Sequence, residues 1–284
     1  MALVLTAGVL WSFQGLIIRH IDEAGSWAVM VWRSAGMLPV LLGFLAWRAG
    51  GSPLPAIRKV GVAGVLGGLG LIGAFGGAIT AIQSTTMANA VFLFAASPFL
   101  AALLGRVALG ERVTPQTWAA IAVALVGIFV MVRDGLAGGA IVGNVAALLS
   151  SLGFAIFTVT LRWRRLDDTL PVVLLGSLFS IIAGILLATQ IGQPMLVPVP
   201  DALWSMFMGA VTLSGGMVLY TMGSRVVPAA ELTLLSNTEV MLAPFWVWLL
   251  LGETASAGTF AGGAILLAAL LFNGLSGARR LAQA

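Results

Sequence analysis

Two stretches of this chain share one pattern: residues 88–114 read ANAVFLFAASPFLAALLGRVALGERVT, and residues 230–256 read AELTLLSNTEVMLAPFWVWLLLGETAS. Each is a long apolar run that ends in Leu-Gly-Glu, and the two glutamates, Glu111 and Glu253, lie 142 positions apart (253 − 111). A shift one residue shorter places Trp11-Ser12-Phe13 opposite Leu152-Gly153-Phe154. The repetition predicts two related halves, residues 1–134 and residues 139–284.

Apolar segments long enough to cross a bilayer fill almost the whole chain. About 20 mainly apolar residues are needed, because the hydrocarbon core is about 30 Å thick and a helix rises about 1.5 Å per residue. The candidate spans are Ala2–Ile18, Ser26–Trp47, Val60–Ile82, Met87–Leu109, Pro115–Val132, Val142–Leu161, Leu170–Ile191, Ala202–Met222, Leu232–Leu251 and Gly258–Leu275. Because each half has an odd number of spans, the second half must enter the membrane from the opposite side. The sequence predicts an all-α polytopic membrane protein with ten transmembrane helices as two inverted five-helix repeats.

The composition agrees with this prediction and excludes other classes of protein. The 284 residues are 60% hydrophobic and 8% charged, whereas a soluble domain carries about 25% charged residues. An ordinary cytosolic enzyme, a disordered chain and a nucleic-acid-binding domain are therefore excluded, and the lipid bilayer is the expected surrounding. With no Cys and one His, the chain predicts no disulfide, no metal site and no cofactor.

The distribution of Lys and Arg predicts the orientation in the membrane, because cytoplasmic loops carry an excess of these residues. With the N-terminus inside, eleven of the 14 cations lie in inner loops, Arg19 and Arg133 lie outside, and Arg33 lies within a span. We therefore expect both termini in the cytoplasm. Residues 1–11 contain no Lys or Arg, which predicts a retained first span and not a cleaved signal peptide.

Several motifs resemble those of a known family. Leu10-Trp11-Ser12, Arg33, Ala96-Ser97-Pro98 and the segment Leu109–Arg112 are similar to segments of the EamA family of the drug/metabolite transporter superfamily. The resemblance covers nearly the whole chain, and within the family it looks most like the YddG-type exporters of aromatic and other amino acids. It implies a transporter of the bacterial inner membrane with a small-molecule substrate. It also implies a cavity walled by spans 1, 3, 4, 6, 8 and 9.

Polar residues present in only one half point to the substrate site, because the repeated scaffold does not require them. Gln14 and Tyr220 both stand opposite alanines in the repeat. Glu239 stands opposite Ser97, since Thr238-Glu239 occupies the place of the Ser-Pro of the first half. We expect all three one-sided residues to face the cavity.

Glu239 is the strongest single candidate for the substrate site. It lies seven residues into its expected span, about 10 Å from the inner edge, where a carboxylate is costly unless it is neutral, paired or hydrated. We expect it to contact a substrate amine or to bind a proton during transport. The alternative is a neutral glutamic acid that braces neighbouring helices. Ser236, three residues earlier, shares its helix face.

Aromatic side chains supply the expected walls of the cavity. Trp11 shares a helix face with Gln14, and Phe92 lies on an apolar stripe of the fourth span. Aromatic walls with a few polar groups suit an amphipathic organic ligand, although lipid contact is the alternative for each ring. Trp246, like five other tryptophans, fits the aromatic belt at the membrane interface better.

Arg33 and three prolines mark further special positions. Arg33 lies about 10 Å below the outer edge. It meets a substrate carboxylate, extends its stem to the outer interface, or braces neighbouring carbonyls with its head group. Pro39, Pro98 and Pro244 lie within spans, and each frees a backbone carbonyl, that of Phe94 in the case of Pro98. Such prolines act as gating hinges or cavity walls, or as static kinks.

Together these features predict a secondary transporter, an exporter of amino acids, including aromatic ones, or of related small metabolites, that works by alternating access. The sequence contains no Walker A motif for ATP hydrolysis. Three alternatives stay open: a carrier of phosphorylated or nucleotide-sugar metabolites, which would need cations around its cavity, an intramembrane enzyme, and a non-transporting receptor. Oligomeric state and proton coupling are left open.

Cysteines introduced by Ser52→Cys and Gln193→Cys should be labelled from opposite faces of the membrane. The predicted topology places Ser52 in an inner loop and Gln193 in an outer loop. Because the chain has no native Cys, a membrane-impermeant maleimide added to intact cells should modify only the variant at position 193. Modification of both variants from one face would contradict the topology.

Overall fold

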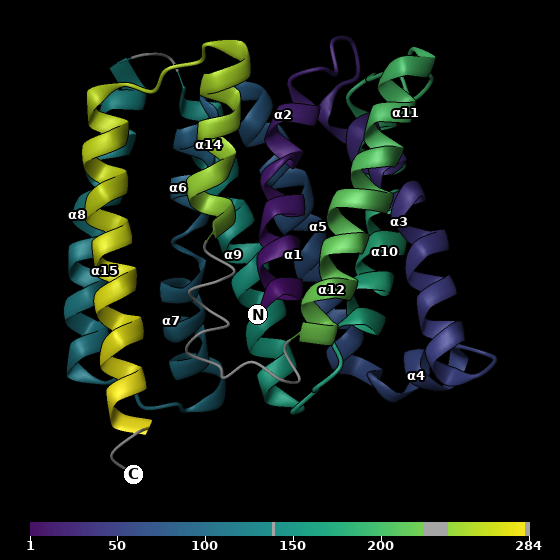
Figure 1. Cartoon of the computed structure of the whole chain (residues 1–284), viewed down its shortest axis with the longest axis horizontal. Coiled ribbons are helices and arrows are strands. Elements are labelled where there is room, and N and C mark those ends of the chain that lie inside the picture. Colours follow the sequence, from purple (N-terminus) through teal and green to yellow (C-terminus); the bar gives the residue numbers. More distant parts are fainter. Residues whose placement is uncertain (138–139, 224–237, 282–284) are drawn as a thin grey trace.

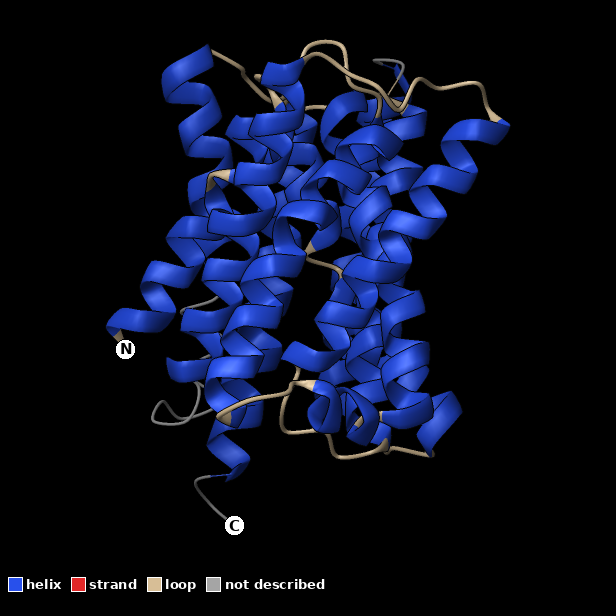
Figure 2. Ribbon diagram, turned by 90° about the vertical axis from the view of Figure 1, so that its right-hand side faces the viewer, coloured by secondary structure: helices blue, strands red, loops and turns tan. Residues whose placement is uncertain are grey.

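The computed structural model describes residues 1–137, 140–223 and 238–281, and within these ranges every regular element is a helix (Figures 1 and 2). A backbone inside a bilayer must satisfy its own N–H and C=O groups, and a helix does so within one segment. In chain order the elements are α1 (Ala2–Ser12), α2 (Gln14–Ile18), α3 (Ser26–Ala49), α4 (Leu54–Lys59), α5 (Gly61–Ser84), α6 (Met87–Phe94), α7 (Ser97–Leu109), α8 (Pro115–Ala137), α9 (Ile141–Trp163), α10 (Leu170–Gln190), α11 (Val199–Phe207), the π-helix η1 (Met208–Gly215), α12 (Gly216–Gly223), α14 (Thr238–Leu251) and α15 (Ala257–Leu281).

Eight helical segments of the described chain are long and apolar enough to cross a membrane. Two shorter apolar segments, Ala2–Ile18 and Thr238–Leu251, fall at the first and ninth expected spans. The first six residues of the expected span Leu232–Leu251 lie outside the described residues. The predicted all-helical membrane fold is therefore confirmed.

Glycines bring the central helices of the bundle into close contact. A Cβ at Gly153 of α9 would collide with the backbone of α5 around Gly70, and a Cβ at Gly77 would collide with the carbonyl of Ala146. Small residues at this spacing let backbones approach closely, as the sequence predicts for the third span. Through α5 and α9 the first part of the chain packs on the second, while α8 and α15 lie side by side at one edge of the bundle (Figure 1).

The fourth span is broken, which corrects one expectation for Pro98. The helix is interrupted at Ala95 and Ala96, so Pro98 lies in the first turn of α7, where its missing N–H costs nothing. The carbonyl of Phe94 accepts a hydrogen bond of 3.1 Å from the Ser151 hydroxyl of α9, which also donates to the carbonyl of Leu93 at 2.8 Å. Ser151 thus supplies a donor to the Phe94 carbonyl, which Pro98 cannot pair, whereas the Leu93 carbonyl also accepts from the N–H of Ala96 at 3.1 Å.

Pro39 and Pro244, in contrast, lie inside α3 and α14 as expected. The first span has a break of its own at Phe13, between α1 and α2. Part of the eighth span is the π-helix η1. Interruptions of this kind often lie at functional sites, and both of these occur close to the predicted substrate residues.

The substitution Ser151→Ala should destabilise the protein, because it removes the hydroxyl that donates to the Phe94 carbonyl. We expect a loss of about 1 kcal/mol in the free energy of unfolding, measured as a lower melting temperature in detergent. Ser180→Ala is the matched control, since the Ser180 side chain is equally buried and its hydroxyl has no partner within the described residues. Equal melting temperatures for the two variants would contradict the role of Ser151.

Candidate functional site

The structure brings together two of the predicted site residues, Trp11 on α1 and Tyr220 on α12. Their ring centroids lie 5.6 Å apart with the planes inclined at 41°. The indole Nε1 of Trp11 donates to the carbonyl of Leu213 in η1 at 3.4 Å. A Cβ at Gly216 would collide with the indole, so glycine at this position allows α1 to pack against the eighth span. Trp11 therefore marks the contact between the first and eighth spans, both of which carry helix interruptions.

Gln14 lies at the start of α2, next to the break at Phe13. Its side-chain amide Nε2 donates to the carbonyl of Trp11 at 3.3 Å, and the hydroxyl of Ser12 donates to the carbonyl of Val9 at 2.7 Å. Both bonds go to carbonyls in the last turn of α1, beside the break. Gln14 is half-buried, and its bond to the Trp11 carbonyl places its side-chain amide next to Trp11.

Glu239 lies in the first turn of α14 and is half-buried. Within the described residues its carboxyl group has no hydrogen bond and no ion pair. Trp246, seven residues later on the same helix face, donates from Nε1 to the hydroxyl of Ser12 at 2.9 Å and stacks on Phe13 with a centroid distance of 5.2 Å. The face of α14 that carries Glu239 is therefore the face that packs on α1.

These contacts also correct the expectation for Trp246. The sequence predicts it in the interfacial belt, yet its ring packs inside the bundle against α1. The seven-residue spacing from Glu239 is the signal that could have placed it there. Trp248, two residues further, is 53% exposed and agrees with the belt.

The remaining predicted site residues lie elsewhere. The Phe92 ring is buried and packs at the position of Gly263 on α15, so it does not meet the Trp11–Tyr220 pair. Ser236 lies outside the described residues. Lining of the substrate cavity by Phe92 and Ser236 stays a prediction.

Arg33 is a buried cation in the first third of α3, and its burial contradicts the alternative that its head group reaches the interface. The residue is only 2% exposed, and its guanidinium lies over the Phe75 ring of α5 at 4.3 Å. Nε and Nη2 have no hydrogen-bond partner within the described residues. Phe75 could not be identified as its partner from the sequence, because nothing in the spacing of α3 and α5 connects the two positions.

The residues that surround Trp11 combine ring surface with an acidic group. Among the described residues no three His, Cys, Asp or Glu side chains come together to hold a metal ion. Aromatic rings from α1 and α12 and a carboxyl group from α14 instead combine apolar surface with one potential negative charge. Such a combination suits a molecule that carries both an amine and a ring.

A small pocket opens between α3 and α12, close to Tyr220 in sequence. It has a volume of about 190 Å³ and is lined by Phe44, Trp47, Arg48, Thr221 and Met222. Sites for small molecules usually measure about 300–1,000 Å³. The pocket is thus too small for such a ligand, and 74% of the Trp47 surface beside it is exposed.

Comparison with known proteins gives a consistent set of relatives. The model of the EamA-like transporter family matches residues 1–133 and residues 141–275. An S-adenosylmethionine/S-adenosylhomocysteine transporter of Chlamydia muridarum is 28% identical over 208 residues, and a riboflavin transporter of Rhizobium johnstonii is 27% identical over 198 residues. These matches cover 66% and 68% of this chain, and 64% of the length of each relative.

A solved crystal structure of another protein shows the same fold. It matches with a TM-score of 0.65 over 95% of both chains, at 19% sequence identity. The two proteins thus share one helical arrangement although their sequences have diverged widely.

An uncharacterized transporter of Archaeoglobus fulgidus is a further relative in sequence. It is 28% identical over 199 residues, which are 68% of this chain and 69% of the relative.

Replacing the buried cation by Arg33→Met should not destabilise the protein. Each buried N–H without a partner costs about 1–3 kcal/mol, and two such donors outweigh a cation–π contact of about 2 kcal/mol. We therefore expect a melting temperature equal to or above that of the wild type. Arg33→Lys, which keeps the charge, is the control and should show no gain. A clear fall in the melting temperature of Arg33→Met would contradict this balance.

Proposed function

The chain belongs to the EamA-like transporter family, and we propose that this membrane protein exports amino acids, including aromatic ones, or related small metabolites by alternating access. The names of two relatives support a small organic substrate, since they transport S-adenosylmethionine/S-adenosylhomocysteine and riboflavin. S-adenosylmethionine carries an amino acid group and an aromatic base, and riboflavin carries an aromatic ring system. Metabolites that combine a ring with an amino acid group are thus the class we favour.

The proposed architecture is ten membrane spans in two inverted halves, residues 1–134 and residues 139–284. The family model matches the chain twice, once within each half, and eight long and two shorter apolar helical segments are present in the described residues. The excess of Lys and Arg in the expected inner loops supports both termini in the cytoplasm of a bacterium, with the protein in the inner membrane.

The observation that carries the substrate proposal is the combination of the Trp11–Tyr220 ring contact with the carboxyl group of Glu239 on the neighbouring helix face. We infer that the two rings contact the apolar part of the substrate. Glu239 supplies the negative charge for its amine, and Gln14 provides a hydrogen bond. Pro39 and Pro244, within α3 and α14, and the break before Pro98 are the proposed hinges.

Glu239→Gln should slow the transport of amino acids and flatten its dependence on pH. The ionised carboxylate attracts an amine and the protonated form does not, so wild-type flux should rise with pH as the carboxyl loses its proton. The amide cannot ionise and should give slower flux without this rise. The measurement is initial flux of labelled aromatic amino acids into liposomes that contain equal amounts of purified protein. Glu23→Gln, which changes an exposed loop carboxyl, is the matched control.

Two outcomes would count against the proposal. Identical rates and pH profiles for wild type and Glu239→Gln would leave Glu239 as a structural residue. Saturable flux of a phosphorylated sugar, with no flux of any amino acid in the same liposomes, would favour a carrier of phosphorylated metabolites instead.

A further inference from the structure

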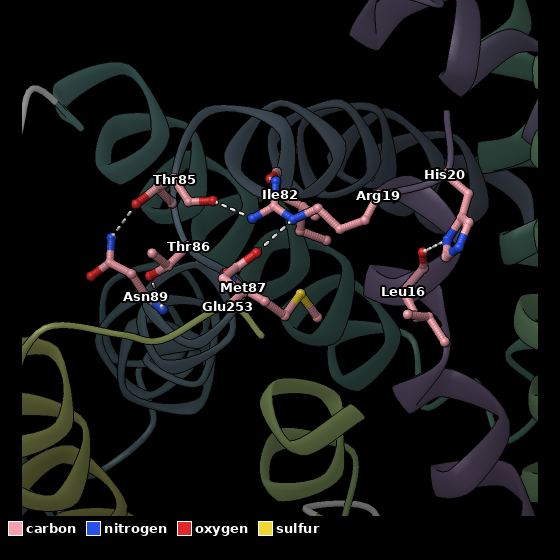
Figure 3. A network of polar contacts seen from close by, with 9 residues as sticks. All are labelled: Leu16, Arg19, His20, Ile82, Thr85, Thr86, Met87, Asn89 and Glu253. Atoms are coloured by element: carbon pink, nitrogen blue, oxygen red, sulfur yellow. Dashed lines mark hydrogen bonds and ion pairs between the residues drawn. The ribbon is translucent and has the colours of Figure 1, made fainter. Parts of the chain in front are cut away.

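The Leu-Gly-Glu motif of the second half forms a network at the Arg19 end of the bundle (Figure 3). Arg19 follows α2, and its Nε lies 2.8 Å from a carboxylate oxygen of Glu253. The guanidinium also donates to the carbonyls of Ile82 and Thr85 at the end of α5, at 2.5 and 2.7 Å. The other carboxylate oxygen of Glu253 accepts from the N–H of Met87, at the start of α6. One ion pair thus connects the first span, the α5–α6 turn and the end of α14.

The motif of the first half forms a corresponding pair at the opposite end of the bundle. Arg162, in the last turn of α9, lies 3.2 Å from a carboxylate oxygen of Glu111. As at Arg19, the guanidinium also donates to a backbone carbonyl, that of Ala101 in α7, at 2.8 Å. This pair connects the end of α9 with the end of α7, the helix that runs to the lower edge of the bundle in Figure 1.

The two motifs place their glutamates by the same local geometry. Gly110 ends α7 with φ +68°, and Gly252 follows α14 with φ +67°. This left-handed conformation is readily adopted by glycine. It turns the chain back at the end of each helix and so directs the following glutamate towards the neighbouring span. The sequence shows the repeated motif but not its partners.

The partners are exchanged between the halves. Each arginine follows or ends the first span of one half, and each glutamate follows the fourth span of the other half. The pairs lie at opposite ends of the bundle, and both are formed in this structure. Opening the bundle at one end would separate one pair while the other pair stays formed.

We propose that Arg19–Glu253 and Arg162–Glu111 are the two gates of transport, which open in alternation at the outer and inner ends. The proposal rests on alternating access in the proposed function, but it concerns different residues from the substrate site. The side chains of the Arg19 pair are 21% and 22% exposed, and those of the Arg162 pair are 42% and 37% exposed. Together with its additional hydrogen bonds, the lower exposure makes the outer gate the tighter of the two in this structure.

The test measures access to the substrate region without using a substrate. Gln14→Cys provides a single reporter thiol in the Cys-free chain, and its labelling rate with an impermeant maleimide is measured from outside intact cells. Adding Glu253→Gln should raise the rate about threefold or more, because the outward-open population grows. Adding Glu111→Gln should lower the rate by a similar factor, because the inward-open population grows.

The control is Asp168→Asn, which removes the ion pair of Asp168 with Arg48, also at the Arg162 end. This pair does not involve the repeated motif, so its loss should leave the labelling rate unchanged. If Glu253→Gln yields no folded protein, Glu253→Asp shortens the same side chain and should change the rate in the same direction.

Equal effects of Glu253→Gln and Glu111→Gln, no effect of either, or an Asp168→Asn effect equal to that of Glu111→Gln would overturn the gate proposal. Its failure is distinguishable from that of the proposed function. Amino acid flux with unchanged labelling rejects the gates alone. Opposite shifts in labelling without amino acid flux retain the gates and reject the substrate class.

Discussion

The requirement that a backbone inside a bilayer satisfies its own hydrogen bonds is the constraint on which this structure depends. The chain meets it with helices, yet it interrupts those helices where they approach the centre of the bundle. Polar side chains lie beside two of these interruptions. Ser12 and Gln14 donate to carbonyls beside the break at Phe13, and Ser151 donates to carbonyls before the break in the fourth span. At the fourth span, the Ser151 hydroxyl supplies the Phe94 carbonyl with a donor that Pro98 lacks.

Close packing determines which side chains can reach the interior. Glycines on α5 and α9 let those helices touch along their backbones, whereas α1 meets α12 and α14 through aromatic side chains. Trp11 of α1 packs against η1, and Trp246 of α14 packs against α1. Their positions depend on the distance between helices, which the spacing of residues along one helix does not fix.

The sequence was sufficient for the all-helical membrane fold and for the pair of Leu-Gly-Glu motifs, because these depend on hydropathy and repetition within the chain. It did not show which side chains contact one another. The burial of Arg33 over the Phe75 ring and the inward position of Trp246 depend on contacts between spans far apart in sequence. Pro98 shows a third limit. A proline in an apolar run indicates that the helix is disturbed, but whether it bends or breaks depends on a donor such as Ser151 on another helix.

The placement of charge follows from the cost of separating it in different surroundings. An ion pair with partly exposed side chains is broken at a cost of about 1 kcal/mol or less, because water replaces the lost partner. Removing one partner of a fully buried pair costs about 3–5 kcal/mol. Pairs that must form and separate repeatedly are therefore better placed at the ends of the bundle, where Arg19, Glu253, Arg162 and Glu111 lie, than at its centre. A free energy of about 1.4 kcal/mol changes a population ratio tenfold. The two additional hydrogen bonds of Arg19, each worth about 1 kcal/mol, are therefore strong enough to bias which end of the bundle opens more readily.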